Sequence, residues 1–513
     1  MRMIERTMRW RLSLATTAAA LTLTGCGDET NEQPPAASAP VASVPMPTTL
    51  ITSLGATGWA STNGGTTGGT GATAAKTYTV LNRNDLIQAL YGNAATIADD
   101  GGVTGTLDNS PKIIYIFGTI NLNVDRLLRE YTADEYIRSS CASAQYGFFS
   151  EAQLNNAYYA AYRPSAWGNA TVPTGVPESA RVCAATLQRR VVQVAIPSNT
   201  SIIGIGSTAR IINGNLNIGP SAAAPVQNIV VRNIGFEDAF DFFPQWDPTD
   251  STTGRWNSAF DLISVQYARR VWIDHNNFSD GARTDDRYPS VWNETVNGVD
   301  YRSSDFKVQH HDGAVDVTRN GDLVTVSSNF ISNHDKTFLI GGTDTASLTA
   351  ENPTALRVTF NDNYFLNLRQ RLPRVRYGQV HAFNNVYVGA TTDPAYPFLV
   401  GFTVGQSGKI YAENNVFQVT GATVTLLANA SVSATRTAGC RTIGYSEEQC
   451  QSTFYAAGTV LNGNPVDVQA SLLARSSAVT PTRWNPASSY SYVLKPTTGL
   501  AQSVFVTAGA GKL

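Results

Sequence analysis

The sequence predicts an all-β protein built as a parallel β-helix, a coil in which every turn adds one strand to each parallel sheet. Charged residues make up only 15% of the chain and hydrophobic residues 42%, which favours buried strands over solvated helices. A short phrase of alternating apolar residues ending in Asn recurs, and no helical patterns of about 10 to 15 residues separate its copies. Repetition of one strand-and-turn unit at a fixed period is typical of a solenoid.

The recurring phrase is found between residues 228 and 417, as NIVVRNIGF, RVWIDHNNF, LVTVSSNF, LRVTFNDNYF, QVHAFNNVY and KIYAENNVF. Asn233 and Asn277 lie 44 residues apart, and Asn363 and Asn385 lie 22 apart. The other intervals, 52, 34 and 30 residues, fit coils of 22 residues with inserted loops. Stacked Asn side chains can bond one another and tolerate a left-handed turn. An antiparallel β-sandwich is the alternative, but it does not explain one phrase recurring in one order.

The first residues are typical of a targeting segment. An apolar run from Leu12 to Thr24, too short to span a bilayer, follows a positively charged segment that includes Arg2, Arg9 and Arg11. The run ends in LTGC, which resembles a bacterial lipobox and implies cleavage before Cys26 and lipidation of its thiol. We therefore expect residues 1–25 to be a lipoprotein signal peptide, with the protein anchored at the bacterial cell envelope or surface. An ordinary signal peptide, and hence secretion, is the alternative.

Two further regions follow the targeting segment. Residues 26–57 are predicted to be the lipidated Cys and a disordered linker, because they are rich in Pro, Ala, Ser and Thr. Residues 58–513 are predicted to form the β-helix domain. An aromatic-rich insertion at residues 125–195 either shapes a groove or caps the coil, and the sequence leaves both readings open.

Four cysteines remain after Cys26, and an even number in an exported protein suggests two disulfides. Three connectivities are open, and we favour Cys141 with Cys183 and Cys440 with Cys450 over free buried thiols. The net charge is −2, so a polyanion would have to bind a local patch, and nucleic acid is not an expected partner. We expect a monomer that meets a membrane only through its N-terminal lipid.

Four stretches resemble the pectate lyases of polysaccharide lyase family 1, in particular the bacillus-type extracellular enzymes. They are FFPQWDPTDSTTGRWNSAFDLISV (242–265), VWIDHNNFSDG (271–281), HHDGAVDVTRNGDLVTVSSNFISNHDKTFLIGGTD (310–344) and RVTFNDNYFLNLRQRLPRVRYGQVHAFNNVYVG (357–389). The resemblance implies a right-handed, single-stranded, pectin lyase-like β-helix. It also implies calcium-dependent β-elimination of α-1,4-linked polygalacturonate (pectate), giving 4,5-unsaturated oligogalacturonates.

Three carboxylates match the calcium site of that family: Asp261, Asp312 and Asp316. Carboxylates crowded together repel one another unless a cation lies among them, and Ca²⁺ prefers oxygen ligands. Related lyases often carry a further acid two residues before the first ligand, where this chain has Ala259. A turn-capping role is the alternative for a single Asp, and Asp312 with the following glycine does have a turn pattern.

The segment RQRLPRVR (369–376) holds four arginines and no acid. By the family motif, Arg371 is the catalytic base, while Arg376 and Lys336 bind the substrate. A solvated basic loop is the plain alternative. A guanidinium normally stays protonated and is a poor base, so Arg371 needs surroundings that disfavour its cation, and we expect an alkaline activity optimum.

Other functions are weighed on the same residues. A pectin lyase on methylated polymer should lack the aspartate trio, and a non-catalytic pectin-binding surface protein should lose Arg371 or Lys336. A β-helical hydrolase needs paired acid and base carboxylates, and the NTD, GHG and RIK segments of polygalacturonases do not occur. The five histidines are interpreted as hydrogen-bonding residues of the core or rim, not zinc ligands: His275, His310, His311, His334 and His381.

Overall fold

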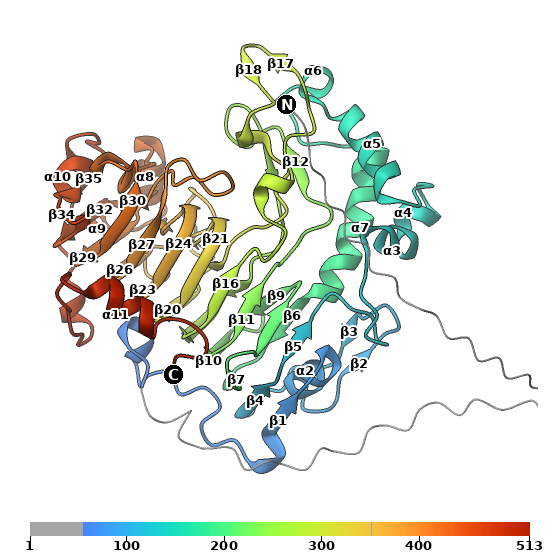
Figure 1. Ribbon diagram of the computed structural model, residues 1–513, viewed down its shortest axis with the longest axis horizontal. Helices are drawn as coiled ribbons and strands as arrows, with labels where there is room; N and C mark the ends of the chain where they lie inside the picture. The colour runs from blue at the N-terminus through green and yellow to red at the C-terminus, as the bar shows by residue number, and fades with distance from the viewer. Residues whose placement is uncertain (1–54, 350) are drawn as a thin grey trace, which may run out of the picture. The chain divides into compact units, whose positions relative to one another are not determined.

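A right-handed parallel β-helix forms the body of the protein, as expected. The computed structural model describes residues 55–349 and 351–513. Three long sheets run along the coil, and the chain visits them in turn, for example β20, β21 and β22, then β23, β24 and β25 (Figure 1). Neighbouring strands pair in parallel except β33 and β34, which pair antiparallel.

The strands of each sheet are given in spatial order. The eleven-stranded sheet holds β1 (Thr77–Val80), β4 (Lys112–Ile116), β7 (Thr200–Gly204), β10 (Val226–Arg232), β15 (Ala268–Asp274), β20 (Asp322–Ser327), β23 (Val358–Asn361), β26 (Gln379–Phe383), β29 (Lys409–Glu413), β32 (Ser452–Ala457) and β35 (Val479–Pro481). The ten-stranded sheet holds β5 (Thr119–Asn121), β8 (Arg210–Ile212), β11 (Gly235–Glu237), β16 (Asn277–Ser279), β21 (Phe330–Lys336), β24 (Tyr364–Gln370), β27 (Val386–Ala390), β30 (Val416–Thr420), β33 (Val460–Leu461) and β34 (Asn464–Pro465). The eight-stranded sheet holds β6 (Gln193–Ile196), β9 (Asn215–Ile218), β14 (Ile263–Gln266), β19 (Val315–Thr318), β22 (Leu339–Ile340), β25 (Arg374–Val375), β28 (Phe402–Val404) and β31 (Ala428–Ala430).

Short hairpins and helices lie outside the coil. The antiparallel pairs are β2 (Thr96–Ile97) with β3 (Val103–Thr104), β12 (Gln245–Asp247) with β13 (Arg255–Asn257), and β17 (Thr295–Val296) with β18 (Val299–Asp300). The α-helices are α2 (Arg83–Leu90), α3 (Ala133–Ser139), α4 (Cys141–Ala144), α5 (Glu151–Ala161), α6 (Pro164–Trp167), α7 (Val176–Val192), α8 (Ala434–Thr442), α9 (Glu447–Cys450), α10 (Val468–Leu473) and α11 (Leu500–Thr507). The 3-10 turns are η1 (Gly58–Ser61), η2 (Ala74–Lys76), η3 (Asp285–Arg287), η4 (Ser304–Phe306), η5 (Val424–Leu426) and η6 (Pro486–Ser488).

The core runs along the inside of the coil as rows of apolar side chains. In one row of the eleven-stranded sheet each residue pairs in register with the next, and none has exposed surface: Val324, Val358, Val380, Ile410 and Phe454. β-branched and aromatic residues pack well on such a pleated inner surface. The alternating pattern of the repeated phrase therefore reports the inward face of each strand.

Five fully buried asparagines form a ladder at one corner of the coil: Asn276, Asn329, Asn363, Asn385 and Asn415. The side-chain amide of each of the first four donates to the Oδ1 of the next Asn, for example from Asn329 to Asn363 at 3.1 Å. The same amide also bonds a strand carbonyl, as Asn329 does with Ile273 O at 3.0 Å. The ladder thus satisfies polar groups that the corner would otherwise bury without partners.

Two asparagines that we predicted for this stack, Asn233 and Asn277, are not in it. Asn276 takes the ladder position, and the N–H of Ile234 donates to its Oδ1 at 3.1 Å. Asn277 begins β16, and its Oδ1 accepts from the backbone of Ala510 at 3.0 Å. The left-handed residue precedes the ladder residue, with φ of 52° at His275, so the correct asparagine is the one after that turn.

The insertion at 125–195 folds into α3 to α7, on the side of the coil where Figure 1 shows the teal helices. A disulfide joins Cys141 to Cys183, and a second joins Cys440 to Cys450, the pairing that the sequence analysis favoured. On α5, Tyr158 and Tyr159 lie with their ring centroids 6.0 and 5.8 Å from the ring of Trp256 in β13. The insertion therefore packs against the hairpin of β12 and β13 through these aromatic contacts.

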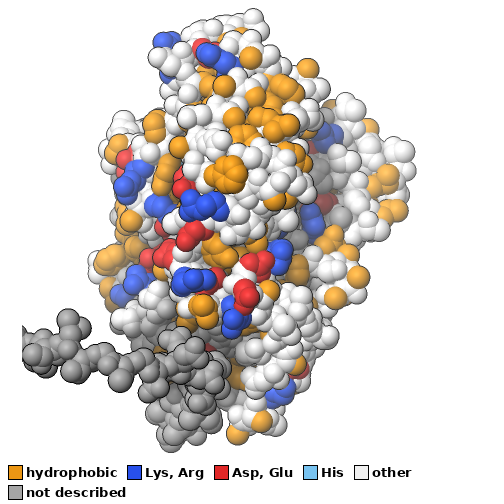
Figure 2. Space-filling view, turned by 90° about the vertical axis from the view of Figure 1, so that its right-hand side faces the viewer, with side chains coloured by type: hydrophobic (Ala, Val, Ile, Leu, Met, Phe, Trp, Pro, Cys, Tyr) orange, Lys and Arg blue, Asp and Glu red, His pale blue; other side chains and the backbone are white. Residues whose placement is uncertain are grey.

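The predicted signal peptide, Cys26 and residues 27–54 of the linker lie outside the described residues, so these remain predictions. Thr57, at the end of the predicted linker, already contacts the coil, since its carbonyl accepts from Thr325 Oγ1 at 2.6 Å. Across the described ranges, no helix has the length and apolarity needed to cross a membrane. Figure 2 shows Lys and Arg side chains interspersed with Asp and Glu across the middle of one face. This face carries no large patch of one sign, which fits a net charge of −2.

Candidate active site

The three predicted carboxylates come from two neighbouring strands of the eight-stranded sheet. Asp261 lies two residues before β14, Asp312 lies three residues before β19, and Asp316 is the second residue of β19. In the ladder of β14 and β19, Ser264 is paired with Asp316. Parallel pairing therefore brings acids that are far apart in sequence to one edge of the coil.

Gly313 allows the carboxylates to come this close. Its N–H donates to Asp261 Oδ1 at 2.9 Å. A methyl group on Gly313 would lie 2.9 Å from that same oxygen and would collide with Asp316 Oδ1. The backbone N–H of Leu339 holds Asp316 Oδ1 at 3.0 Å. Two carboxylate oxygens thus converge over a residue without a side chain, each held by a backbone donor.

The acids perturb one another strongly. Burial, followed by the charge of Asp312, raises the pKa of Asp261 from 3.8 to about 7, against a hydrogen bond from Ser264 Oγ at 2.5 Å. Burial and the charge of Asp261 raise the pKa of Asp316 well above its ordinary value. The charge of Arg371 offsets part of both effects. Desolvated carboxylates that disfavour one another's charge are suited to a hard cation, so the residues fit Ca²⁺.

Two predicted cations lie beside these acids. Lys336, the last residue of β21, has its Nζ 3.5 Å from Asp312 Oδ1. Arg371 follows β24 directly, with a φ of 58° that is unusual for a residue other than glycine. Within the described ranges the guanidinium of Arg371 has no hydrogen bond or ion pair. It is held near acids without being bound by one, as a base or a substrate ligand requires.

The next two arginines of the segment differ in their surroundings. Burial, and then the charges of Arg376 and Arg371, lower the pKa of Arg374 to about 10. Arg376 is engaged elsewhere, because its Nε donates to Asp344 Oδ1 at 2.6 Å and a terminal nitrogen donates to Gly341 O at 2.9 Å. Arg374 lines the same cleft as Lys336 and Arg371, whereas Arg376 does not line it. The substrate role of Arg376 stays a prediction.

A cleft of about 310 Å³ lies beside Arg371 and Lys336. Six cationic side chains line it, namely Arg255, Lys307, Lys336, Arg369, Arg371 and Arg374, against three acidic ones, Asp250, Asp305 and Asp335. The predicted trio of Asp261, Asp312 and Asp316 does not line the cleft itself. Two cleft-lining cations interact with the trio: Lys336 lies 3.5 Å from Asp312, and the charge of Arg371 lowers the pKa of Asp261. The cleft therefore favours an anionic ligand, and the acids lie where a cation could meet that ligand.

Comparisons with known proteins decide the family. A family model described as "Pectate lyase" matches residues 175–513. A pectate lyase of Bacillus subtilis strain 168 is 36% identical over 456 residues, covering 89% of this chain and 92% of that protein. The chain belongs to the pectate lyase family. A solved pectate lyase from Acidovorax avenae subsp. citrulli shares 55% identity at a TM-score of 0.88, covering 95% of this chain and 99% of that one. Another solved pectate lyase, bound to a hexasaccharide, shares 34% identity at a TM-score of 0.70, with 89% and 97% covered.

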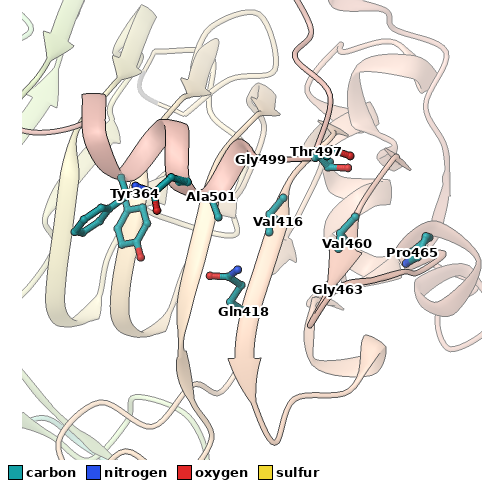
Figure 3. A pocket seen from close by; sticks show the side chains of 12 residues that line it. Tyr364, Val416, Gln418, Val460, Gly463, Pro465, Thr497, Gly499 and Ala501 are labelled. Atoms are coloured by element: carbon teal, nitrogen blue, oxygen red, sulfur yellow. The ribbon is translucent and has the colours of Figure 1, made fainter.

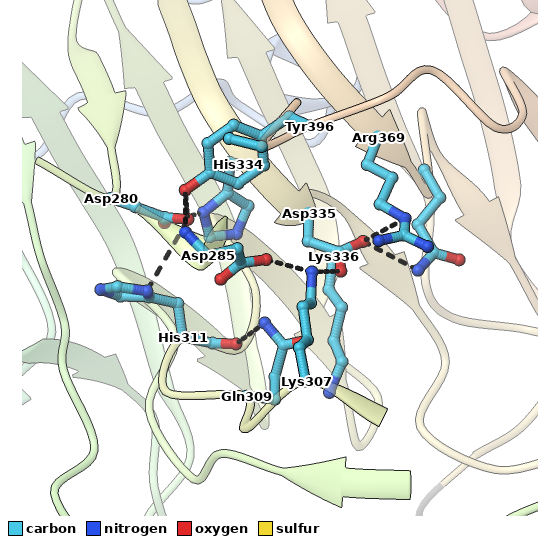
Figure 4. Close-up of polar contacts among 12 residues, drawn as sticks. Asp280, Asp285, Lys307, Gln309, His311, His334, Asp335, Lys336, Arg369 and Tyr396 are labelled. Carbon is cyan, nitrogen blue, oxygen red and sulfur yellow. Dashed lines mark hydrogen bonds and ion pairs between the residues drawn. The ribbon is translucent and has the colours of Figure 1, made fainter. Parts of the chain in front are cut away.

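This polysaccharide lyase also carries a buried ion network that the sequence analysis missed (Figure 4). Lys307 bonds Asp285 and lies 2.5 Å from Asp335 Oδ2, while Gln370 donates to Asp335 Oδ1 at 2.8 Å. Lys336 and Arg371 follow Asp335 and Gln370 directly, so the network fixes the strands from which both cleft cations project. The sequence carried no signal of this network, since its partners come from separate coils, such as Asp280 and His334, which are 54 residues apart.

The network contains a group whose ligand atoms could hold a metal: Asp280, Asp285 and His311, all buried and within 4.8 Å of one another. Side chains of the protein already bond both acids, Lys307 to Asp285 and His334 to Asp280. His334 bonds Asp280; burial lowers the pKa of His334, but the charge of Asp280 and this hydrogen bond outweigh burial and raise the pKa above its ordinary value. His311 also bonds Asp238 at 2.8 Å, so both histidines act as hydrogen-bonding core residues, as expected.

A larger hollow of about 670 Å³ lies on the ten-stranded sheet beside α11 (Figure 3). It is lined by residues such as Tyr364, Val416 and Val460, with no cationic or acidic side chain among the lining residues. Nothing in it could neutralise a uronate. The smaller cleft, which is lined by charged side chains, is therefore the candidate active site.

Proposed function

We propose that this pectate lyase cleaves α-1,4-linked polygalacturonate by calcium-dependent β-elimination and releases 4,5-unsaturated oligogalacturonates. The observation that carries the proposal is the placement of Arg371, an unpaired guanidinium whose charge acts on the buried pair Asp261 and Asp316. A base without an acid partner, next to carboxylates that need a cation, suits removal of a proton beside a carboxylate. The hexasaccharide found on a relative agrees with a chain-like ligand.

Asp261, Asp312 and Asp316 would hold the calcium ion. When bound, Ca²⁺ supplies the positive charge that neutralises the uronate carboxylate and stabilises the charge developing at C5. Lys336, beside Asp312, would bind the same carboxylate and orient the sugar. The two backbone donors at Gly313 and Leu339 keep the acids in place before substrate arrives.

Arg371 in its neutral form would take the C5 proton. The electron pair of that C–H bond becomes the C4–C5 double bond, the C4–O bond breaks, and the leaving oxygen takes a proton from solvent. A neutral guanidine is scarce at neutral pH, because a guanidinium ordinarily stays protonated. We therefore propose an activity that rises toward alkaline pH, and an optimum in the acid range would contradict this assignment.

The test is an assay for ultraviolet absorbance of the unsaturated products of polygalacturonate. We expect product with calcium, none after chelation, and recovery on adding calcium back. Arg371→Ala should abolish product formation while leaving the melting temperature close to that of the parent. Full activity in chelator would refute the calcium role, and full activity of Arg371→Ala would refute its role as base.

We further propose that the lyase is exported, anchored through a lipid on Cys26, and monomeric. Two disulfides among the described residues support an oxidising compartment. Cys26→Ser should move the protein from the membrane fraction to the soluble fraction. An unchanged distribution would contradict the anchor.

A further inference from the structure

We propose that Arg255 forms an additional subsite for a uronate carboxylate, on the cleft wall built by the β12–β13 hairpin. This subsite rests on the proposed function, since it assumes a polyuronate in the cleft. No role for Arg255 is predicted from the sequence. It stands 116 residues before Arg371, yet both side chains line one cleft.

The charge of Arg255 is not neutralised by the protein. One terminal nitrogen donates to Thr253 Oγ1 and to Gly254 O, both at 2.6 Å. The guanidinium carbon lies 5.1 Å from the ring centroid of Phe306. No carboxylate within the described ranges lies at ion-pair distance from it. A guanidinium has five N–H donors, so Arg255 keeps donors and a full charge for a ligand.

The hairpin holds this side chain in a fixed place. Trp246 and Trp256 are paired across β12 and β13, and Trp246 is fully buried. Gly254 has φ of 80°, and a methyl group there would collide with the ring of Trp246. The rings of Trp246 and Trp292 pack edge to face with centroids 4.6 Å apart. A cation mounted on such a packed aromatic cluster loses little conformational freedom when a ligand binds.

The ligand class follows from the cleft and from the polymer. Six cationic side chains line the cleft against three acidic ones, and polygalacturonate carries one carboxylate on every sugar. The guanidinium fork matches a carboxylate better than a hydroxyl. Lys336 and Arg371 serve the sugar that reacts, whereas Arg255 comes from a separate hairpin and would serve another sugar of the same chain. The insertion then has a function, because α5 packs behind this hairpin.

The experiment measures the binding of hexagalacturonate in calcium by titration calorimetry. Arg371→Ala is the background that prevents turnover, and Arg255→Gln and Arg255→Lys are added to it. We expect Arg255→Gln to raise Kd about tenfold, the low end of what a hydrogen bond to a charged group provides. The Kd of Arg255→Lys should lie between that of the background and that of Arg255→Gln, because lysine keeps the positive charge but lacks the two-pronged guanidinium. The fully methyl-esterified hexamer should bind Arg255→Gln and its background alike.

The matched control is Arg302→Gln, an exposed arginine near the same aromatic cluster that is paired with Asp300 at 2.7 Å and does not line the cleft. Its Kd should equal that of the background. Equal Kd values for Arg255→Gln and the background, or an equal loss in Arg302→Gln, would overturn the subsite. If Arg255→Gln unfolds, Arg255→Lys is the deciding variant. A Kd for Arg255→Lys equal to that of the background would show that the guanidinium of Arg255 does not bind the carboxylate, and would overturn the subsite. Failure of the parent protein to cleave polygalacturonate would instead refute the proposed function.

Discussion

Replacing Asp261 by Asn should stabilise the calcium-free protein at pH 8 and abolish its response to calcium. In the folded protein the pKa of Asp261 is raised from 3.8 to about 7, chiefly by burial and then by Asp312. A pKa raised from 3.8 to about 7 corresponds to ~4 kcal/mol, at ~1.36 kcal/mol for each tenfold change in the ionisation constant. Because the folded pKa is raised, the stability tied to this carboxyl is complete below pH 3.8 and is lost as the pH rises through about 7.

The assay is thermal unfolding in chelator and in calcium, at acid pH and at pH 8. Asn cannot ionise, so Asp261→Asn should gain up to ~4 kcal/mol over the parent in chelator at pH 8, with little difference near pH 4. Calcium should stabilise the parent and not the variant, because the variant lacks one ligand. Asp99→Asn is the control, since the Asp99 side chain is 92% exposed. Equal stability of Asp261→Asn and the parent in chelator at pH 8, or an equal gain from calcium, would refute the reasoning.

Three further substitutions test neighbouring parts of the account. Ser264→Ala removes the hydroxyl that donates to Asp261 Oδ2 at 2.5 Å, and should weaken calcium binding about 10- to 100-fold by calorimetry, with Ser264→Thr restoring it. Gly313→Ala places a methyl group against Asp316 and Asp261, and should lose calcium binding and product formation about tenfold or more while the coil stays folded by circular dichroism. Asn363→Ala leaves ladder groups without partners, and should lower the free energy of unfolding by about 3 kcal/mol in a denaturant titration.

Two of these substitutions, Ser264→Ala and Asn363→Ala, have matched controls. Asn217→Ala lies in the same row of the sheet as Ser264, with no bond to the acids, and should leave calcium binding unchanged. Asn464→Ala removes one side-chain hydrogen bond of 3.2 Å at an exposed position and should cost far less than Asn363→Ala. Calcium affinity that survives in Ser264→Ala or Gly313→Ala, or equal costs for the two Asn variants, would contradict the corresponding interpretation.

The fold could be predicted because each coil of a solenoid repeats the same strand and turn, so the same sequence pattern recurs along the chain. Alternating residues such as Val324 and Val358 mark the inward face of each coil, and Asn363 and Asn385 mark its corner. The error at Asn277 has a local cause. Two asparagines stand together there, and only the position of the left-handed turn decides which one is buried.

Less of the site could be predicted, because the cleft is made by long-range contacts. Family motifs pointed to Asp261, Lys336 and Arg371, and the structure brings these side chains to one edge of the coil. Arg255 and Lys307 gave no sequence signal. Their roles depend on a hairpin packed against the insertion and on acids that reach them from other coils.

The central claim is that the aspartate trio binds calcium beside Arg371. A calorimetric titration of calcium into the metal-free protein at alkaline pH tests this claim most directly, with Asp316→Asn measured in the same way. We predict saturable binding to the parent and its loss in Asp316→Asn. A parent that binds no calcium, or an Asp316→Asn protein that binds it with unchanged affinity, would contradict the account.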